Sequence, residues 1–327
     1  MVVSYGLADF LLIFLYLIRL YEPLYHQTRL QPQDANISIS SSEKGTGFRF
    51  LKFGFNEYLY KLLWFLGGNG IDIYFVTYLV GISGAGLFSF ATNIVNFIME
   101  YAPGIIIRPI VLPLFVRQYT RNKKTSEIEY LFQLHNKFII FLTFPIFLFM
   151  GALAKEIIIY VFAPKFIPAL NTLMIFLFFM FSINILIPIR NILAVLERTD
   201  ISNYSAIFAI LKFLLIFPFM KIYGINGAAL AYGISLWGIV AFNLIKMRSF
   251  FNPVYPWKAI FKILINGLIA GLVLYLLKNN ISNIITLISV IFTGVITYIF
   301  LSIYNKPFNN YDRELLNKGF KIPLWHF

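Results

Sequence analysis

The sequence has no cysteine, few charges and little polar chain between its apolar runs, and each shortage excludes a class of protein. Zero cysteine among 327 residues excludes disulfide scaffolds, thiolate metal sites and cysteine nucleophiles. Only 13% of the residues are charged and 59% are hydrophobic, with a mean hydropathy of +0.78. This leaves too little polar surface to coat a soluble globule of the same length. The composition therefore indicates a membrane protein.

Motifs for catalysis and for cofactor binding are absent from the sequence as well. The three histidines, His26, His135 and His326, lack the spacing of metal ligands. There is no Walker loop, no dinucleotide fingerprint and no Ser, His and Asp constellation. External loops of at most about fifteen residues leave no room for an external catalytic domain. We therefore expect no enzyme activity, no metal and no cofactor.

Long apolar segments recur along the whole chain. A transmembrane helix needs roughly 20 mostly apolar residues, and about nine segments meet this requirement. They are 3–20, 50–66, 87–116, 131–153, 166–194, 201–220, 225–245, 259–277 and 284–303. Segment 73–80 follows three glycines and has two interpretations, a continuation of the second span or an interfacial piece. The predicted fold is all-α, a polytopic membrane helix bundle.

Basic residues are concentrated at every second break between these spans. They follow the first, third, fifth, seventh and ninth spans, and loops rich in cations face the cytoplasm. We therefore predict an external N-terminus, a cytoplasmic C-terminus and a location in the plasma membrane. The net charge of +13 is spread along these loops, which indicates lipid headgroups and not nucleic acid as the partner.

The N-terminal region suggests a domain boundary. The first span lacks a basic n-region and a small-residue cleavage site, so we interpret it as a retained helix. The Ser-rich stretch 32–47 is typical of a flexible linker. The predicted parts are a transmembrane helix at 1–20, a cytoplasmic linker at 21–49, a six-helix lobe at 50–248, two further transmembrane helices at 249–305 and a cytoplasmic tail at 306–327.

Ionisable residues at membrane depth are costly unless they are paired or hydrated, so they mark candidate cavity residues. Glu57 and Lys61 lie in the second span at the i, i+4 spacing, with Glu first, which favours an intrahelical pair. The pair has two interpretations: it neutralises itself so that the helix can be inserted, or it lines a substrate cavity.

The third predicted span carries a polar stripe. Asn93, Asn96 and Glu100 recur at steps of three and four and so share one helix face, with Arg108 roughly 80° round from Glu100. Either these side chains form hydrogen bonds to another helix or they line a hydrated lumen, and a stripe that ends in a cation favours the lumen.

Two further cations lie in later spans. Lys212 is near the centre of the sixth span, too deep for easy snorkelling. It either pairs with Glu57 or Glu100 on another helix or contacts an anionic substrate. Arg190, at the end of the fifth span, either snorkels to the inner headgroups or belongs to the same cavity.

Several segments carry a family resemblance. The stretch NILAVLERTD at 191–200, a span, and then YGINGAALA at 223–231 resemble the C-terminal lobe of Wzx-type polysaccharide biosynthesis flippases. These belong to the multidrug/oligosaccharidyl-lipid/polysaccharide exporter (MOP) superfamily. FAPKF at 162–166 is similar to a short external turn of the family, and Asp72 with Gly81 and Ala91 is similar to its first C-lobe hairpin. Phe88 and Phe90 stand where the family often has Tyr.

The resemblance covers about residues 50–303 and implies a MATE-like architecture. Family members have two six-helix lobes, often followed by two extra helices, and rock between inward-open and outward-open states. The first span of this chain resembles the last N-lobe helix, the second to seventh spans the C-lobe, and the last two the appended pair. Most of the N-lobe has no counterpart. We therefore hypothesise a truncated or split gene product, or a lobe completed by a homodimer or by a separate N-lobe chain.

The function that the resemblance implies is the translocation of a polyprenyl-pyrophosphate-linked oligosaccharide across the plasma membrane for surface polysaccharide biosynthesis. Arg108, Lys212 and Lys61 would offer charge to the pyrophosphate. The expected partners are this lipid-linked oligosaccharide and membrane lipids.

Two alternatives stay open at this point. A cation-coupled multidrug exporter on the same fold would use Glu57, Asp72 and Glu100 to bind protons or Na⁺. A non-transporting membrane enzyme or scaffold of glycan synthesis belongs to a different class, and the sequence contains no motif in its favour.

Overall fold

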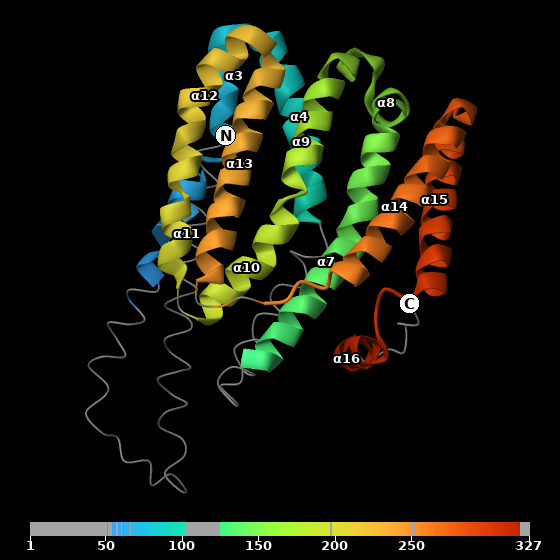
Figure 1. Ribbon diagram of the computed structural model, residues 1–327. Coiled ribbons are helices and arrows are strands. Elements are labelled where there is room, and N and C mark those ends of the chain that lie inside the picture. The colour runs from blue at the N-terminus through green and yellow to red at the C-terminus, as the bar shows by residue number, and fades with distance from the viewer. Residues whose placement is uncertain are drawn as a thin grey trace, which may run out of the picture. The chain divides into compact units, whose positions relative to one another are not determined.

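The computed structural model describes residues 51, 54–56, 58–59, 61–65, 67–101, 125–196, 198–249, 251 and 253–320. The chain divides into two units, Met1–Leu51 and Lys52–Phe327, and the second unit contains the helix bundle (Figure 1). The described regular elements of this unit are all helical. They are α3 (Asn69–Val80), α4 (Ile82–Glu100), α7 (Thr125–Ala152), α8 (Ala154–Ile157), η1 (Ile158–Phe162), η2 (Pro164–Ala169), α9 (Leu170–Met180), α10 (Ile183–Val195), α11 (Thr199–Ser205), α12 (Ile207–Tyr223), α13 (Ile225–Arg248), α14 (Trp257–Leu277), η3 (Lys278–Asn280), α15 (Ile284–Asn305) and α16 (Asn310–Phe320).

Eight helices in the described part of the chain are long and apolar enough to cross a membrane. They run over Gly54–Val80, Ile82–Glu100, Ile128–Ala152, Pro164–Val195, Asp200–Tyr223, Ile225–Arg248, Trp257–Asn280 and Ile284–Asn305. The second to ninth predicted spans correspond to these helices, and the all-α membrane bundle is confirmed. Segment 73–80 continues the second span. The first predicted span, 3–20, and the linker 21–49 lie outside the described residues.

Two glycines join antiparallel helix neighbours. Gly81 (φ 93°) lies between α3 and α4, and Gly224 (φ 56°) lies between α12 and α13; both conformations favour a residue without Cβ. A Cβ on Gly227 would lie 2.1 Å from the carbonyl oxygen of Phe219. The first turn of α13 can therefore approach α12 this closely only with glycine at 227, which accounts for the GINGAA pattern in the sequence.

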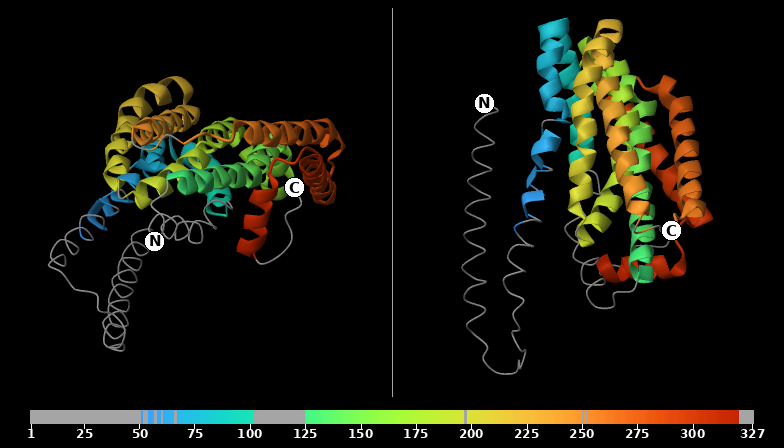
Figure 2. Two further views of the ribbon diagram at one scale, coloured as in Figure 1. Left: turned by 60° about the horizontal axis from the view of Figure 1, so that its bottom comes forward. Right: turned by 60° about the vertical axis from the view of Figure 1, so that its left-hand side comes forward.

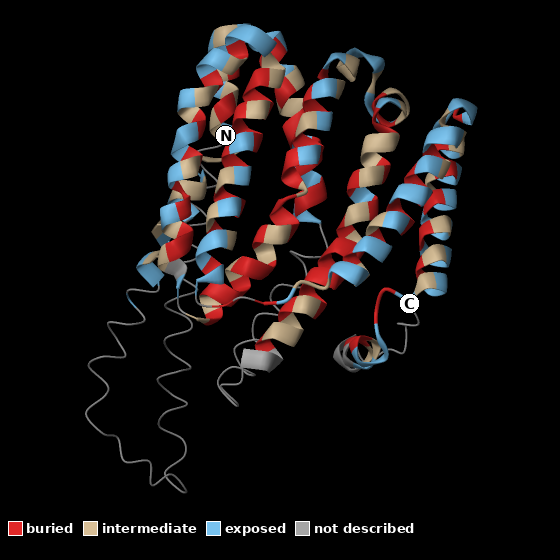
Figure 3. Cartoon of the chain, viewed as in Figure 1, coloured by how far each residue is buried: buried red, intermediate tan, exposed pale blue. Residues whose placement is uncertain are grey.

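The bundle is held together by two large apolar clusters. The first joins α3, α4, α9 and α13, with the rings of Phe88 and Phe176 at 5.5 Å between centroids. The second joins α7, α14 and α15, with Phe141 packed against Tyr298 at 5.3 Å and Phe308 at 5.2 Å. Buried residues occur along the length of α7, α9 and α10, whereas much of the surface of α14 and α15 is exposed (Figure 3). The last two spans are thus attached to the other described helices through α7.

The C-terminal helix α16 is docked across the lower end of α7 in the views of Figures 1 and 2. The buried Asp312 carboxylate accepts hydrogen bonds from the Tyr130 hydroxyl and the Lys137 ammonium, both on α7. It also accepts one from the backbone N–H of Asn309 at 2.9 Å. A carboxylate that is removed from water is stable only with such partners. These residues belong to the predicted tail, and the structure shows a helix there that is anchored by a buried ion pair.

We expect Asp312→Asn to loosen α16, because Lys137 then loses its buried counterion. The chain has no cysteine, so a single Leu316→Cys reports on docking through its rate of maleimide labelling. We expect this rate to rise about tenfold or more, since about 1.4 kcal/mol of lost docking energy corresponds to a factor of ten. The matched control is Asp200→Asn, which neutralises an exposed carboxylate on α11. Equal labelling rates in the two variants would show that the ion pair does not hold α16.

Candidate functional site

One face of α4 presents polar side chains within a candidate membrane span. Asn93, Asn96 and Glu100 are exposed, whereas Phe88 and Val95 on the opposite face are fully buried. The three polar residues thus share one exposed face, as their spacing predicted. Polar groups and carboxylates are costly against lipid hydrocarbon. This face is therefore suited to water or to a polar ligand.

Aromatic rings lie at the Glu100 end of the same face. Phe97 is 64% exposed and Tyr101 is 59% exposed, and their ring centroids are 4.7 Å apart. Exposed rings beside amides and a carboxylate are a surface to which a sugar can bind, because ring faces pack on its C–H groups while polar groups take its hydroxyls.

Of the other predicted cavity residues besides Lys212, the structure describes two and leaves two outside the described part of the chain. Lys61 is exposed, and Arg190 is half-buried on α10. Glu57 and Arg108 lie outside the described residues. The Glu57 and Lys61 pair and the cationic end of the α4 stripe therefore stay predictions.

Lys212 lies inside the bundle and not on an open surface. Its side chain and that of Asp72 are both 0% exposed, and its Nζ lies 2.6 Å from Asp72 Oδ1. The same ammonium donates hydrogen bonds to the carbonyl oxygens of Gly67 and Gly68, at 2.8 and 2.9 Å. The buried cation is thus surrounded by oxygen atoms from another helix.

The structure corrects the expected partner of Lys212. From the sequence we expected Glu57, Glu100 or an anionic substrate, whereas the partner is Asp72 in the first turn of α3. The reason is packing, because α12 crosses α3 at the glycine break and places the two side chains together. A negative charge near a helix N-terminus is also favourable.

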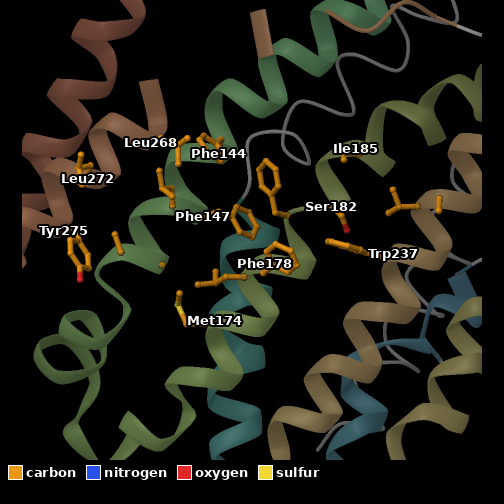
Figure 4. Close-up of a pocket in the computed structure, with 18 of the residues that line it drawn as sticks. Phe144, Phe147, Met174, Phe178, Ser182, Ile185, Trp237, Leu268, Leu272 and Tyr275 are labelled. Carbon is orange, nitrogen blue, oxygen red and sulfur yellow. The ribbon is translucent and has the colours of Figure 1, made fainter. Parts of the chain in front are cut away.

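An apolar groove of about 990 Å³ lies among α7, α9, α10, α13 and α14 (Figure 4). Its walls include Phe144, Phe147, Phe178, Trp237 and Leu268, and the lining residues Ser182 and Tyr275 carry hydroxyl groups. All five of these helices belong to membrane-spanning segments. The groove is therefore suited to a hydrocarbon chain.

The groove could not be predicted from the sequence, because its lining residues are brought together from helices far apart in the chain. The aromatic run FLFFMF at 176–181 was the one local signal in this region. Among the described residues, no group of three His, Asp or Glu side chains could hold a metal ion.

Two comparisons with known proteins bear on this arrangement. Residues 38–171 match the family described as "Polysaccharide biosynthesis protein". A solved structure, "Lipid II flippase MurJ, inward closed conformation", matches with a TM-score of 0.63 at 18% identity, over 75% of this chain and 52% of that one. The chain therefore shares the fold of this solved flippase structure. It spans about half the length of the MurJ chain. No match to a curated protein was found.

The flippase fold confirms the resemblance inferred from the sequence. This chain is a multi-pass membrane protein, and it shares its fold with a solved flippase structure. Within the flippase fold, the exposed polar face of α4 and the apolar groove offer two chemically different surfaces, one for polar groups and one for hydrocarbon.

Proposed function

We propose that this chain contributes a lobe to a flippase that moves a polyprenyl-pyrophosphate-linked oligosaccharide across the plasma membrane. The observation that carries the proposal is the exposed face of α4, where Asn93, Asn96 and Glu100 lie on a candidate membrane span beside two exposed rings. A helix in lipid would not keep such a face unless it bordered water or a polar ligand. An oligosaccharide supplies many hydroxyls for amide and carboxylate partners.

The apolar groove supports the lipid part of the same substrate. It provides about 990 Å³ lined almost wholly by apolar side chains, which favours a polyprenyl chain over a free sugar. The pyrophosphate needs a cation, and Lys212 is held in its buried ion pair. Lys61, which is exposed, and Arg108 remain the proposed phosphate partners.

A cavity for such a substrate needs a second wall opposite α4. Residues of the same chain outside the described ones, a second copy or a separate chain could provide this wall. We propose such a second lobe without assigning its source.

The multidrug exporter alternative is weaker on the described residues. It needs acids that are free to bind protons or Na⁺, and Asp72 is already paired with Lys212. Glu100 is exposed and is compatible with either function, so the two functions must be separated by experiment.

Deletion of the gene in its own cell tests the proposal. We expect loss of surface polysaccharide, accumulation of the lipid-linked oligosaccharide facing the cytoplasm and unchanged drug susceptibility, because only the translocation step is missing. Normal surface glycan with increased drug susceptibility would establish the exporter instead. Incorporation of labelled sugar by the purified protein would establish the enzyme.

A further inference from the structure

Three oxygen atoms converge on the Lys212 ammonium in the interior of the bundle. They are Asp72 Oδ1 at 2.6 Å and the carbonyl oxygens of Gly67 and Gly68 at 2.8 and 2.9 Å. A carboxylate combined with backbone carbonyls at an interrupted transmembrane helix is the kind of oxygen set that binds hard monovalent cations. We call these three groups the oxygen cage.

The cage is built by a break in the second span. Gly68 is extended (φ −70°, ψ 163°) and interrupts the helix directly before α3. A Cβ on Gly67 would lie 2.3 Å from the Cβ of Ala209, so glycine at 67 lets α12 approach the break closely. Ala209 is three residues before Lys212, and this approach places the ammonium at the carbonyls. Carbonyls at membrane depth need such a donor, because hydrocarbon offers none.

The surroundings of the cage also favour a cation. The Lys212 Nζ lies 5.0 Å from the centroid of the Phe213 ring and 5.7 Å from that of Tyr232, and ring faces attract positive charge. A small cavity of about 10 Å³ adjoins Gly67, Gly68, Tyr232 and Ser235. This is about the space of one water molecule.

We propose that the oxygen cage is a monovalent-cation site whose cation is the protein's own Lys212 ammonium. The tethered charge neutralises Asp72 and holds the break together, so this cage exchanges no Na⁺ with the solvent. Removal of the ammonium leaves a carboxylate and two carbonyls with room for an ion, and thereby turns the cage into a site for Na⁺ or ammonium ion. The inference does not depend on which substrate is moved.

Thermal unfolding of the purified full chain in detergent tests this proposal. Lys212→Ala is compared with the wild type in sodium chloride, ammonium chloride and choline chloride of equal ionic strength. We expect Na⁺ and ammonium ion to raise the Tm of Lys212→Ala by about 2–4 °C over choline when their concentration is roughly tenfold above the Kd. The wild type should show equal Tm values in the three salts.

The matched control is the double variant Asp72→Asn, Lys212→Ala. It keeps the space that the Lys212 side chain leaves and lacks the Asp72 carboxylate. Its Tm should not depend on the cation. The proposal is also supported if Lys212→Ala folds only when Na⁺ or ammonium ion is present. The proposal is overturned if Lys212→Ala shows equal Tm values in all three salts, if it stays unfolded in all of them, or if Na⁺ specifically stabilises the wild type, because each result would leave Lys212 as an ordinary ion-pair partner.

Discussion

Replacement of Asn93, Asn96 and Glu100 by leucine should reduce glycan export roughly tenfold to a thousandfold, because three net hydrogen bonds of about 0.5–1.5 kcal/mol each are removed from the path of the substrate. These side chains are exposed on α4 and do not belong to its buried core. The loss should therefore appear in transport while expression and thermal stability stay near the wild type. The measurement is surface polysaccharide per unit of membrane-inserted protein in the complete transporter.

The chain offers a matched control on α15. Ser289, Thr293 and Thr297 lie at steps of four residues, and each hydroxyl donates to the carbonyl oxygen four residues earlier in its own helix, at 2.9, 2.9 and 2.8 Å. A polar stripe that is satisfied by its own backbone needs no water and no substrate. Ser289→Ala, Thr293→Val and Thr297→Val together should leave export unchanged. If the α4 variant also exports normally, the α4 face is not part of the substrate path.

Asp72→Asn should cost about 3–5 kcal/mol of stability, because it leaves the fully buried Lys212 ammonium without its counterion. Asp72→Asn with Lys212→Met should recover most of this loss, since a neutral pair of similar volume needs no counterion. The single variant should show a clearly lower thermal unfolding midpoint than the double variant in detergent.

The control for this prediction is Asp200→Asn. Its carboxylate is also paired with a cation, but Arg198 and Asp200 have side chains that are 48% and 36% exposed, and exposed pairs contribute little. We expect no measurable change in the midpoint. If Asp72→Asn unfolds at the same temperature as Asp200→Asn, the buried pair does not stabilise the bundle.

The transmembrane helices were predictable because their formation is a local property. Backbone groups in hydrocarbon must be satisfied within the same helix, so the length and hydropathy of a segment nearly decide whether it spans. The predicted spans 225–245 and 284–303 agree within a few residues with the observed helices Ile225–Arg248 and Ile284–Asn305. The shared face of Asn93, Asn96 and Glu100 was predictable for a similar reason, since it depends only on helix periodicity.

Contacts between helices were not predictable in the same way. Asp72 and Lys212 are 140 positions apart in the sequence, and no periodicity relates them. They meet because glycine at 67 lets Ala209 approach the break in the second span. The docking of α16 on α7 through Asp312 and Lys137 is equally a product of packing.

The sequence by itself determined the class, the eight described spans and the polar face of α4, because hydropathy and periodicity act along one helix. Only the tertiary structure decided where Lys212 lies, which acid neutralises it and that an apolar groove forms among α7, α9, α10, α13 and α14. Those features depend on close approach between helices, and close approach is decided by side chains that are distant in sequence and adjacent in space.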